Sequence, residues 1–298
     1  MTTTAIEVAN EPAAAVWRIR ADNPSPMTGS GTNSYVLHGA TGAVVIDPGP
    51  ALPAHLAAIR AALRGAPLRA ILVTHPHLDH SGLVAGLKAF SGAQVYGFGG
   101  AQAGRSALMQ RLAAEGLAGG GEGIDAGYRP DVLVADGEVL RLGGLQIEAI
   151  HTPGHMGGHL SFALGDALFS GDHVMGWAST LVSPPDGDMA AYMASLARLA
   201  ARQWRQFWPG HGEGIADPAT RQAELAAHRR ARETAICAAL QAGPGRPAAL
   251  AALIYTDTPT ALLPAAARNI LAHLIDLHDR NIVTATKPLG ADAQFKII

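Results

Sequence analysis

Seven histidine and aspartate residues, set along the chain in a fixed order, constrain its fold more than any other feature. Four of them stand in one run, Thr74–His80, which reads THPHLDH. The other three arrive singly, each directly after a glycine. The full set is His75, His77, Asp79, His80, His155, Asp172 and His211. Imidazole nitrogens and carboxylate oxygens are the ligands that Zn²⁺, Mn²⁺ or Fe²⁺ accept, so we expect the fold to bring these segments together around metal.

Seven such ligands are too many for one tetrahedral ion, and they suit two ions that share a bridging carboxylate. The predicted sets are His75, His77 and His155 for one ion, Asp79, His80 and His211 for the other, and Asp172 between them. Each ion keeps an open position, which is typical of a catalytic site. A water between two cations loses a proton near neutral pH and becomes a nucleophile. Asp79 is a candidate catalytic residue, because it could accept that proton while it stays a ligand.

Each part of this pattern, taken alone, has an ordinary structural explanation. A lone HxH usually has no function, and His155 or His211 could simply bond to loop backbone. The combination is more specific, because the ligand segments follow segments that we expect to be strands. Loops at the C-terminal edges of strands are where α/β folds build their sites.

Short apolar segments alternate with Ala/Leu-rich segments over most of the chain, which predicts an α/β fold. The expected strands are Ser34–Leu37, Ala43–Ile46, Ala70–Val73, Gln94–Tyr96, Leu145–Ile150, Leu160–Ala163, Ala167–Phe169 and Gln206–Trp208. The expected helices are Leu52–Arg64, Gly82–Phe90, Gln102–Glu115 and Asp188–Ala201. Some strands, such as Val44–Ile46, are wholly apolar, as strands covered on both faces tend to be.

A change in composition near residue 216 predicts two domains, a catalytic one of residues 1–216 and a C-terminal one of residues 217–298. Asp217 and Pro218 suit the N-cap and first turn of a long helix. Helices are expected at Ala219–Leu240, Pro247–Tyr255 and Leu262–His278, and short strands at Ile282–Thr286 and Gln294–Ile298. Three helices followed by a hairpin are the plan of a winged-helix domain.

Charge and cysteine content limit the expected binding partners and the expected cellular compartment. The formal net charge of −2 gives no overall attraction to nucleic acid or acidic membranes. The single cysteine, Cys237, cannot form an internal disulfide, which fits a reducing compartment and predicts a cytoplasmic protein. Residues 1–7 lack the pattern of a secretory signal. No apolar run reaches the ~18 residues of a membrane helix, so we expect no membrane association.

The ligand residues give the chain a resemblance to the metallo-β-lactamase superfamily over about residues 15–215. The family's HxHxDH run stands here as His75–His80, its third histidine as His155, its bridging aspartate as Asp172 and its last histidine as His211. The resemblance implies an αββα sandwich, with the site at the open edge between two sheets, and two transition-metal ions, usually zinc. It also implies that Asp47 orients ligand groups. A turn-capping role before the following Pro-Gly is the alternative, and the two roles are compatible.

Further segments resemble the lactamase-β-like protein 2 group, which joins the metallo-hydrolase domain to a C-terminal winged helix. They are Asn23–Gly29, Gly31–Tyr35, Gly171–Trp177, Pro184–Met189, Arg230–Glu233 and Ala272–Leu274. One animal member of this group is a single-strand-preferring RNA endonuclease. Met156 departs from the superfamily, which usually has threonine after the third histidine, and should affect loop packing more than metal binding.

Several chemistries are compatible with these motifs. The phrase Ser170-Gly171-Asp172 favours thioesterases, lactonases and phosphodiesterases over true β-lactamases. The leading expectation is a dinuclear zinc hydrolase, with Mn²⁺ or Fe²⁺ as other metals, whose metal-bridging hydroxide cleaves single-stranded RNA. The alternative is a glyoxalase-II-like thioesterase or a lactonase acting on a small metabolite. The stretch from Asp172 to His211 has no room for the extra domain of large processing nucleases, which weakens the nuclease hypothesis.

A non-enzymatic alternative is a winged-helix nucleic-acid-binding protein with a structural metal. Its support is the charge of residues 218–298, where 9 Lys+Arg stand against 6 Asp+Glu. A solvated helix face is the simpler explanation of its arginines, which include Arg229, Arg230, Arg232 and Arg268. Binding of single strands normally uses aromatics between basic residues, and here these are limited to Tyr255 and Phe295.

The remaining candidates surround the site. His173 is a candidate catalytic residue, as proton donor or oxyanion partner, and a histidine that fixes the neighbouring Asp172 is the alternative. Met175 and Trp177 could form an apolar wall for substrate or simply be core. His273 is expected to be a packing residue within its helix, and a position near the substrate cleft is the alternative. We expect an anionic or ester-type substrate, and the Ala-rich helix surfaces would suit a homodimer.

Overall fold

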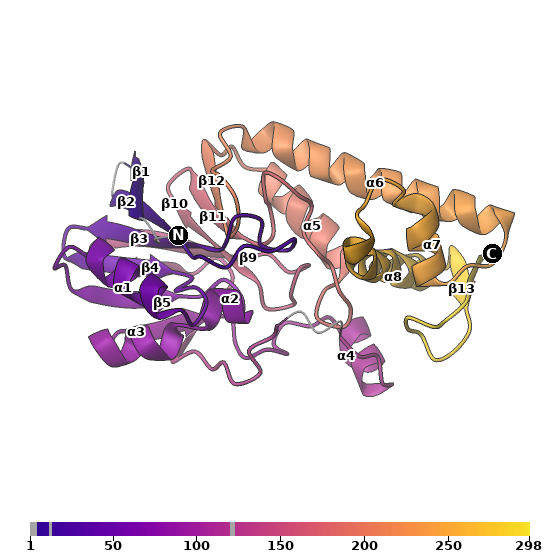
Figure 1. The fold of residues 1–298 in the computed structure, drawn as a ribbon, viewed down its shortest axis with the longest axis horizontal. Helices are drawn as coiled ribbons and strands as arrows, with labels where there is room; N and C mark the ends of the chain where they lie inside the picture. Colours follow the sequence, from indigo (N-terminus) through magenta and orange to yellow (C-terminus); the bar gives the residue numbers. More distant parts are fainter. Residues whose placement is uncertain (1–4, 12–13, 120–122) are drawn as a thin grey trace.

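The computed structural model describes residues 5–11, 14–119 and 123–298. Its larger part is an αββα sandwich, in which two sheets lie face to face and helices cover both outer faces (Figure 1). The first sheet has seven strands in the order β1-β2-β3-β4-β5-β6-β7, and the second has five in the order β12-β11-β10-β9-β8. The predicted α/β class and sandwich architecture are confirmed.

All of the predicted strands are present, and the ends of both sheets carry strands that the sequence does not predict. The first sheet consists of β1 (Ala5–Glu11), β2 (Ala14–Arg20), β3 (Asn33–Gly39), β4 (Gly42–Ile46), β5 (Leu68–Leu72), β6 (Gln94–Gly97) and β7 (Val132–Leu133). The second consists of β8 (Val139–Leu142), β9 (Leu145–His151), β10 (Leu160–Leu164), β11 (Ala167–Gly171) and β12 (Gln206–Pro209). The unpredicted strands β1, β2, β7 and β8 are near the sheet edges and are short or carry charged residues, so their apolar pattern is weak.

Apolar side chains fill the space between the two sheets, because successive residues of a strand point to opposite faces. The first sheet contributes Leu37 and Val44, and the second contributes Ile147, Phe162 and Phe169. Burial of one such side chain contributes about 1.5–3 kcal/mol. This core holds the sheets in register, so that the loops at their common edge face one another.

Helices cover the outer faces of the sandwich. The first sheet is covered by α1 (Pro53–Ala62) and α3 (Val84–Ser91), and the second by α5 (Met189–Ala200) and the first part of α6 (Pro218–Ala242). The single turn α2 (Leu78–Ser81) precedes α3. The helix predicted from Gln102 begins only at α4 (Ala107–Ala114), because the Ser106 hydroxyl caps it by accepting from the Met109 N–H.

The C-terminal part has the predicted winged-helix plan. Its helix α6 begins at Pro218, where the Asp217 side chain accepts from the Thr220 N–H. The other elements are α7 (Pro247–Ile254), the 3₁₀ turn η1 (Thr260–Leu262), α8 (Leu263–Asp279), β13 (Val283–Ala285) and β14 (Phe295–Ile297). Side chains of α4 pack into the same core as α6, α7 and α8. The domain boundary between residues 216 and 217 stays a prediction.

None of the helices in the described ranges has the length and hydropathy of a membrane span. Residues 1–4, which belong to the segment inspected for a secretory signal, lie outside the described residues.

Candidate metal centre

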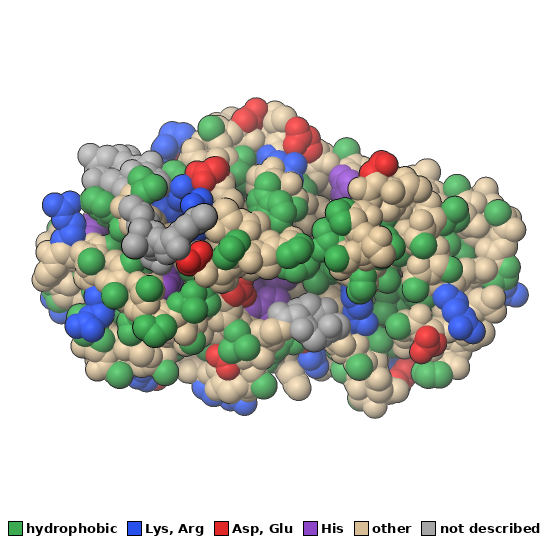
Figure 2. All heavy atoms as spheres, viewed as in Figure 1, with side chains coloured by type: hydrophobic (Ala, Val, Ile, Leu, Met, Phe, Trp, Pro, Cys, Tyr) green, Lys and Arg blue, Asp and Glu red, His purple; other side chains and the backbone are tan. Residues whose placement is uncertain are grey.

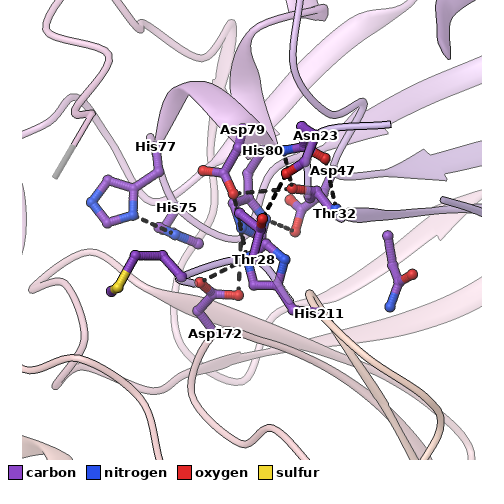
Figure 3. A network of polar contacts seen from close by, with 12 residues as sticks. Asn23, Thr28, Thr32, Asp47, His75, His77, Asp79, His80, Asp172 and His211 are labelled. Atoms are coloured by element: carbon purple, nitrogen blue, oxygen red, sulfur yellow. Dashed lines mark hydrogen bonds and ion pairs between the residues drawn. The ribbon is translucent and has the colours of Figure 1, made fainter. Parts of the chain in front are cut away.

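The predicted ligands lie beyond the C-terminal ends of four strands. β5 leads into the HxHxDH run, β9 leads to His155, β11 to Asp172 and β12 to His211. The turn α2 presents the last two ligands of the run, Asp79 and His80. Because the sheet core holds these strand ends at one edge, residues far apart in the sequence converge (Figure 3).

The first predicted set forms a tight group of buried imidazoles. The His77 Nδ1 atom lies 3.0 Å from the His75 Nε2 atom and 3.1 Å from the His155 Nε2 atom. Nitrogens bound to one tetrahedral zinc at about 2.0–2.1 Å lie roughly 3.3–3.4 Å apart. The three nitrogens are therefore spaced to hold one ion after shifts of a few tenths of an ångström.

The second predicted set is more open on one side. The Asp79 Oδ2 atom lies 3.3 Å from the His211 Nε2 atom and 3.5 Å from the His80 Nε2 atom. Both histidines are buried, whereas the side chain of Asp79 is 27% exposed. This group can also hold one ion, and its carboxylate is the ligand that solvent reaches most easily.

Asp172 lies between the two groups, as a bridging ligand must. Its Oδ1 atom is 3.4 Å from the His80 Nε2 atom, and its Oδ2 atom is 3.3 Å from that of His211 and 3.8 Å from that of His155. The Asp172 Oδ1 and His80 Nε2 atoms are buried and have no hydrogen-bond partner among the described residues. Buried polar atoms rarely stay unpaired, so their geometry fits a divalent cation.

Hydrogen bonds on the far side of each ring orient the ligand nitrogens. The Nδ1–H groups of His155 and His211 donate to the carbonyls of Leu181 (2.7 Å) and Gly31 (3.3 Å), and that of His80 donates to Asp47 (2.9 Å). Oxygen atoms of this kind only accept, so Nδ1 carries the proton. Each Nε2 atom is then free to face the centre as a metal ligand.

Asp47 fulfils the orienting role that the resemblance implies. Its Oδ2 atom accepts from His80 and from the Thr74 hydroxyl (2.7 Å), and its Oδ1 atom accepts from the Thr74 N–H (2.7 Å). Its backbone lies at φ +50°, a region that residues other than glycine seldom occupy. Strain of this kind concentrates at functional sites, where the surrounding contacts enforce it.

Several buried polar residues support the ligands, and the sequence did not predict them as site residues. The Thr32 hydroxyl donates to the Asp79 Oδ2 atom (3.0 Å), and the Asn33 side-chain amide donates to the Pro209 and Gly212 carbonyls (3.0 and 2.8 Å) on either side of His211. The Asp172 N–H donates to the His159 Nε2 atom at 3.2 Å. The sequence feature that could have pointed to Thr32 and Asn33 is that both are polar and stand directly before the expected apolar strand Ser34–Leu37.

The structure places His173 away from the cavity. Its ring is fully buried against Tyr192, with ring centroids 4.9 Å apart, and neither ring nitrogen has a hydrogen-bond partner among the described residues. The geometry gives no support to its predicted catalytic role, which stays a prediction. His273 is buried within α8, as a packing residue would be.

Burial and neighbouring carboxylates act in opposite directions on the histidines. Burial lowers the pKa of His75 well below its usual value. Burial also opposes charge on His80, yet the nearby carboxylates of Asp79, Asp172 and Asp47 raise its pKa well above the usual value. At His211 burial again lowers the pKa, but the carboxylates of Asp172 and Asp79 together outweigh it and raise the pKa to about 9. The carboxylates around His80 and His211 thus favour bound positive charge, which a divalent cation supplies in place of protons.

A cavity of about 830 Å³ lies over the centre. Three of its lining side chains are large hydrophobic groups that are about half exposed, namely Met27, Leu78 and Trp177. The lining also includes Met175 and residues from α8. Figure 2 shows histidine side chains at the surface near the middle of one face, beside an acidic side chain and close to hydrophobic ones.

Comparison with known proteins agrees with this geometry. Residues 27–211 match the profile described as "Metallo-beta-lactamase superfamily", a span that begins before the first ligand and ends at the last. The chain belongs to the metallo-β-lactamase superfamily. Residues 247–289 match the profile described as "Beta-lactamase associated winged helix domain". The protein is therefore a hydrolase of this superfamily with an associated C-terminal winged helix.

Curated relatives carry several names. Beta-lactamase-like protein 2 homolog of Drosophila melanogaster is 29% identical, with 95% of this chain and 94% of that protein covered, which confirms the resemblance to that group. Lactamase-like protein aptB of Emericella nidulans is 31% identical over 78% of this chain and 68% of its own. Atrochrysone carboxyl ACP thioesterase of Aspergillus chevalieri is 31% identical over 76% of this chain and 66% of its own.

Solved structures share the whole architecture. A metallo-beta-lactamase family protein from Thermus thermophilus has a TM-score of 0.75 and 26% identity, covering 95% of this chain and 98% of that one. A beta-lactamase domain protein from Burkholderia ambifaria has a TM-score of 0.78 at 23% identity, covering 99% and 93%. The second likeness supports the fold alone.

Proposed function

We propose that this protein is a dinuclear metal-dependent hydrolase of a small ester or thioester. The observation that carries the proposal is the position of the ligand cluster in a cavity lined largely by apolar side chains. Arg268 is the one Lys or Arg among the described lining residues, and its guanidinium donates to Ser183 and to the Pro184 carbonyl. An RNA backbone needs several cations against its phosphates, whereas an ester or thioester does not.

Zinc is the proposed metal at both positions, because it accepts imidazole and carboxylate ligands in tetrahedral sites that keep an open position. Mn²⁺ and Fe²⁺ accept the same donors. When bound, the ions lower the pKa of a water and polarise the oxygen of the electrophile. Asp79 lines the cavity, and its Oδ2 atom is held by Thr32. Its carboxylate is the proposed acceptor of the proton that the attacking water releases.

RNA hydrolysis, the leading expectation from sequence, finds less support in the C-terminal part. Most of its arginines make internal contacts: Arg221, Arg229, Arg232 and Arg268 donate to backbone carbonyls, and Arg280 pairs with Glu233. Phe295 is fully buried, so it cannot stack on a base. The name of the thioesterase from Aspergillus chevalieri, a relative of similar identity to the others, adds support to the thioester alternative.

The test is hydrolysis by purified, metal-analysed protein offered an acyl thioester of N-acetylcysteamine and a short single-stranded RNA side by side. We expect thioester turnover, and we expect His75→Ala to lower it at least about 100-fold, because one ion loses one of its ligands. His38→Ala is the matched control, since His38 lies outside the site and contacts the Ala62 carbonyl. If the wild type cleaves RNA but no thioester, and His75→Ala loses the RNA cleavage, the proposed substrate is wrong while the metal centre still stands.

A further inference from the structure

The cavity over the metal centre has two chemically different sides. One side carries ligands, including His155, Asp172 and His211. The other side is formed by the C-terminal part, from Tyr255 through η1 to the first turns of α8. A segment that begins more than 40 residues after the last ligand therefore completes the cavity.

Most of this C-terminal wall is apolar, and its polar members are Thr258, Arg268 and Asn269. Its members include Tyr255, Ala261, Leu262, Pro264, Ala265 and Ala266. Alanine at three of these positions leaves space beside α8. Apolar side chains exposed in a cavity with a few convergent polar groups are typical of a ligand site, and the ligand would present an apolar surface to α8.

We infer that the C-terminal wall binds the acyl chain of the substrate, so that the substrate is a thioester of an extended apolar acyl group. This inference rests on the proposed function and names its substrate class. The thioester carbonyl lies over the ligand cluster while the chain lies along α8. In the reaction, the water oxygen forms a bond to the carbonyl carbon and the carbon–sulfur bond breaks. The proton that Asp79 accepts passes to the leaving thiolate, and the second proton of the water goes to solvent. The products are a carboxylate and a thiol.

Ala265 offers the sharpest test, because it is half-buried on α8 and lines the cavity. Ala265→Phe should lower kcat/KM for a decanoyl N-acetylcysteamine thioester at least roughly tenfold relative to the acetyl thioester, since the ring occupies the space of several methylenes. Leu262→Ala, which removes apolar contact without adding bulk, should also weaken the decanoyl substrate selectively. Ala252→Phe is the control, at an exposed α7 position outside the lining.

The outcomes separate the two levels of the proposal. A wild-type preference for the decanoyl over the acetyl thioester that Ala265→Phe removes supports the acyl wall. If the wild type and both wall variants, at full metal content, hydrolyse thioesters with the same chain-length profile, the C-terminal wall does not bind the acyl chain. The proposed function would still stand. Wild-type protein that holds metal but hydrolyses neither thioester would overturn the proposed function itself.

An independent observation concerns the loop between β11 and α5, which lies beside the metal centre. Two arginines of α6 donate to its backbone: Arg221 to the carbonyls of Met175 (2.8 Å) and Ala178 (3.0 Å), and Arg229 to that of Thr180. The Arg229 side chain is almost fully buried, and among the described residues it has no acidic partner. Burial of such a cation is costly unless it is well bonded. The buried position of Arg229 therefore indicates a structural role in holding this loop.

The far side of the same loop orients a ligand. The Leu181 carbonyl accepts from the His155 Nδ1–H, and the Thr180 hydroxyl lies 3.2 Å from the same nitrogen. Arg229 also donates to the Asn269 side-chain oxygen (3.1 Å), which accepts from the Val182 N–H (3.0 Å). Residues 180–182 are thus held between Arg229 and His155. We propose that Arg229 is a positioning residue, which sets the ring orientation of His155 through this loop.

The test uses metal binding as well as activity. Arg229→Met should weaken the binding of one Zn²⁺ about 10–100-fold, as loss of an orienting partner does, and should change the Co²⁺ absorption spectrum of the cobalt-loaded protein. Arg229→Lys, which keeps one donor, should restore part of both, and the exposed neighbour variant Arg230→Met should match the wild type. If Arg229→Met fails to fold, Arg229→Lys decides. The assignment is overturned if the deciding variant binds Zn²⁺ as tightly as the wild type and has the same Co²⁺ spectrum.

Discussion

At the scale of single residues, Gly210 is among the most constrained positions in the site. A Cβ atom there would lie 2.4 Å from the Asp172 Oδ1 atom and 2.7 Å from the His80 Cε1 atom, far inside contact distance. Glycine before His211 therefore reflects close packing of the chain against two other ligands. The glycine-preceded pattern of the single ligands has, at this position, a steric cause.

Replacement of Gly210 by alanine should displace Asp172 or His80 and lower the metal content, while the fold stays close to that of the wild type. Metal analysis and far-UV circular dichroism of the purified variant measure the two effects. Gly137→Ala is the control: its φ of +74° makes alanine cost roughly 1–2 kcal/mol, but no atom lies within 4 Å of the new Cβ. Full metal content in Gly210→Ala would contradict the steric argument.

Asp47 tests the importance of ligand orientation. Asparagine at this position offers one acceptor oxygen and one NH₂ group to three donors, from the Thr74 N–H, the Thr74 hydroxyl and the His80 Nδ1–H. Asp47→Asn should therefore weaken metal binding about 10–100-fold, measured by competition with a chromophoric chelator. Asp131→Asn, at a surface pair with Lys88, should not. Unchanged affinity would mean that His80 keeps its tautomer without the carboxylate.

At the scale of elements, α5 depends on its N-cap residue, Asp188, for both its start and its anchoring. The Asp188 side chain caps the helix by accepting from the Ala191 N–H (3.1 Å), and it also accepts from the Ser106 hydroxyl (2.7 Å), which itself caps α4. One carboxylate thus ties together the starts of two helices that are 82 residues apart. This arrangement also ends the loop that carries Thr180 and Leu181.

Asp188→Ala should lower the free energy of unfolding by at least about 1 kcal/mol, the usual effect of losing an N-cap. The midpoint of urea unfolding measures the change. Asp188→Asn is the matched control, because asparagine caps helices nearly as well as aspartate. Equal midpoints for Asp188→Ala and Asp188→Asn would show that the cap contributes little here.

At the scale of the whole molecule, the sandwich and the winged helix share their apolar cores. Met109 and Leu112 of α4 pack with Ile270 and Leu274 of α8, and Leu225 of α6 packs against the helix-covered face of the second sheet. Figure 1 shows α6 running from the sandwich along the C-terminal helices, with α4 on the opposite side. Interfaces of this apolar kind favour cooperative folding of both parts.

Truncation after residue 216 should therefore give a fragment that is insoluble or unfolded, because it exposes the apolar side chains of α4 and α5. Soluble yield and thermal unfolding by circular dichroism, compared with the full chain, measure this outcome. A soluble fragment that binds metal with wild-type stoichiometry would show that the catalytic part folds by itself. The predicted homodimer, which stays a prediction, is measured on the full chain by light scattering.

The sequence by itself determined which histidines and aspartates are the predicted ligands, which strands carry apolar patterns and which helices follow caps. These features are encoded locally, in strand and helix periodicity and in donors that stand a few residues apart. The run His75–His80 and the capped start of α6 at Asp217 are of this kind, and the fold has both. The resemblance to the metallo-β-lactamase superfamily rests on the ligand motifs, whereas the winged-helix plan follows from the helix and strand patterns of the C-terminal part.

The tertiary structure alone decided which polar residues support the site. Asn33 bonds the Pro209 carbonyl across 176 positions, and Arg229 bonds the Thr180 carbonyl across 49. In the sequence Arg229 is one of several arginines on a helix, where a solvated face was the simpler explanation. Its inward position follows from how α6 packs on the loop beside His155. Contacts between distant segments depend on the packing of whole layers, and no local pattern of residues carries that information.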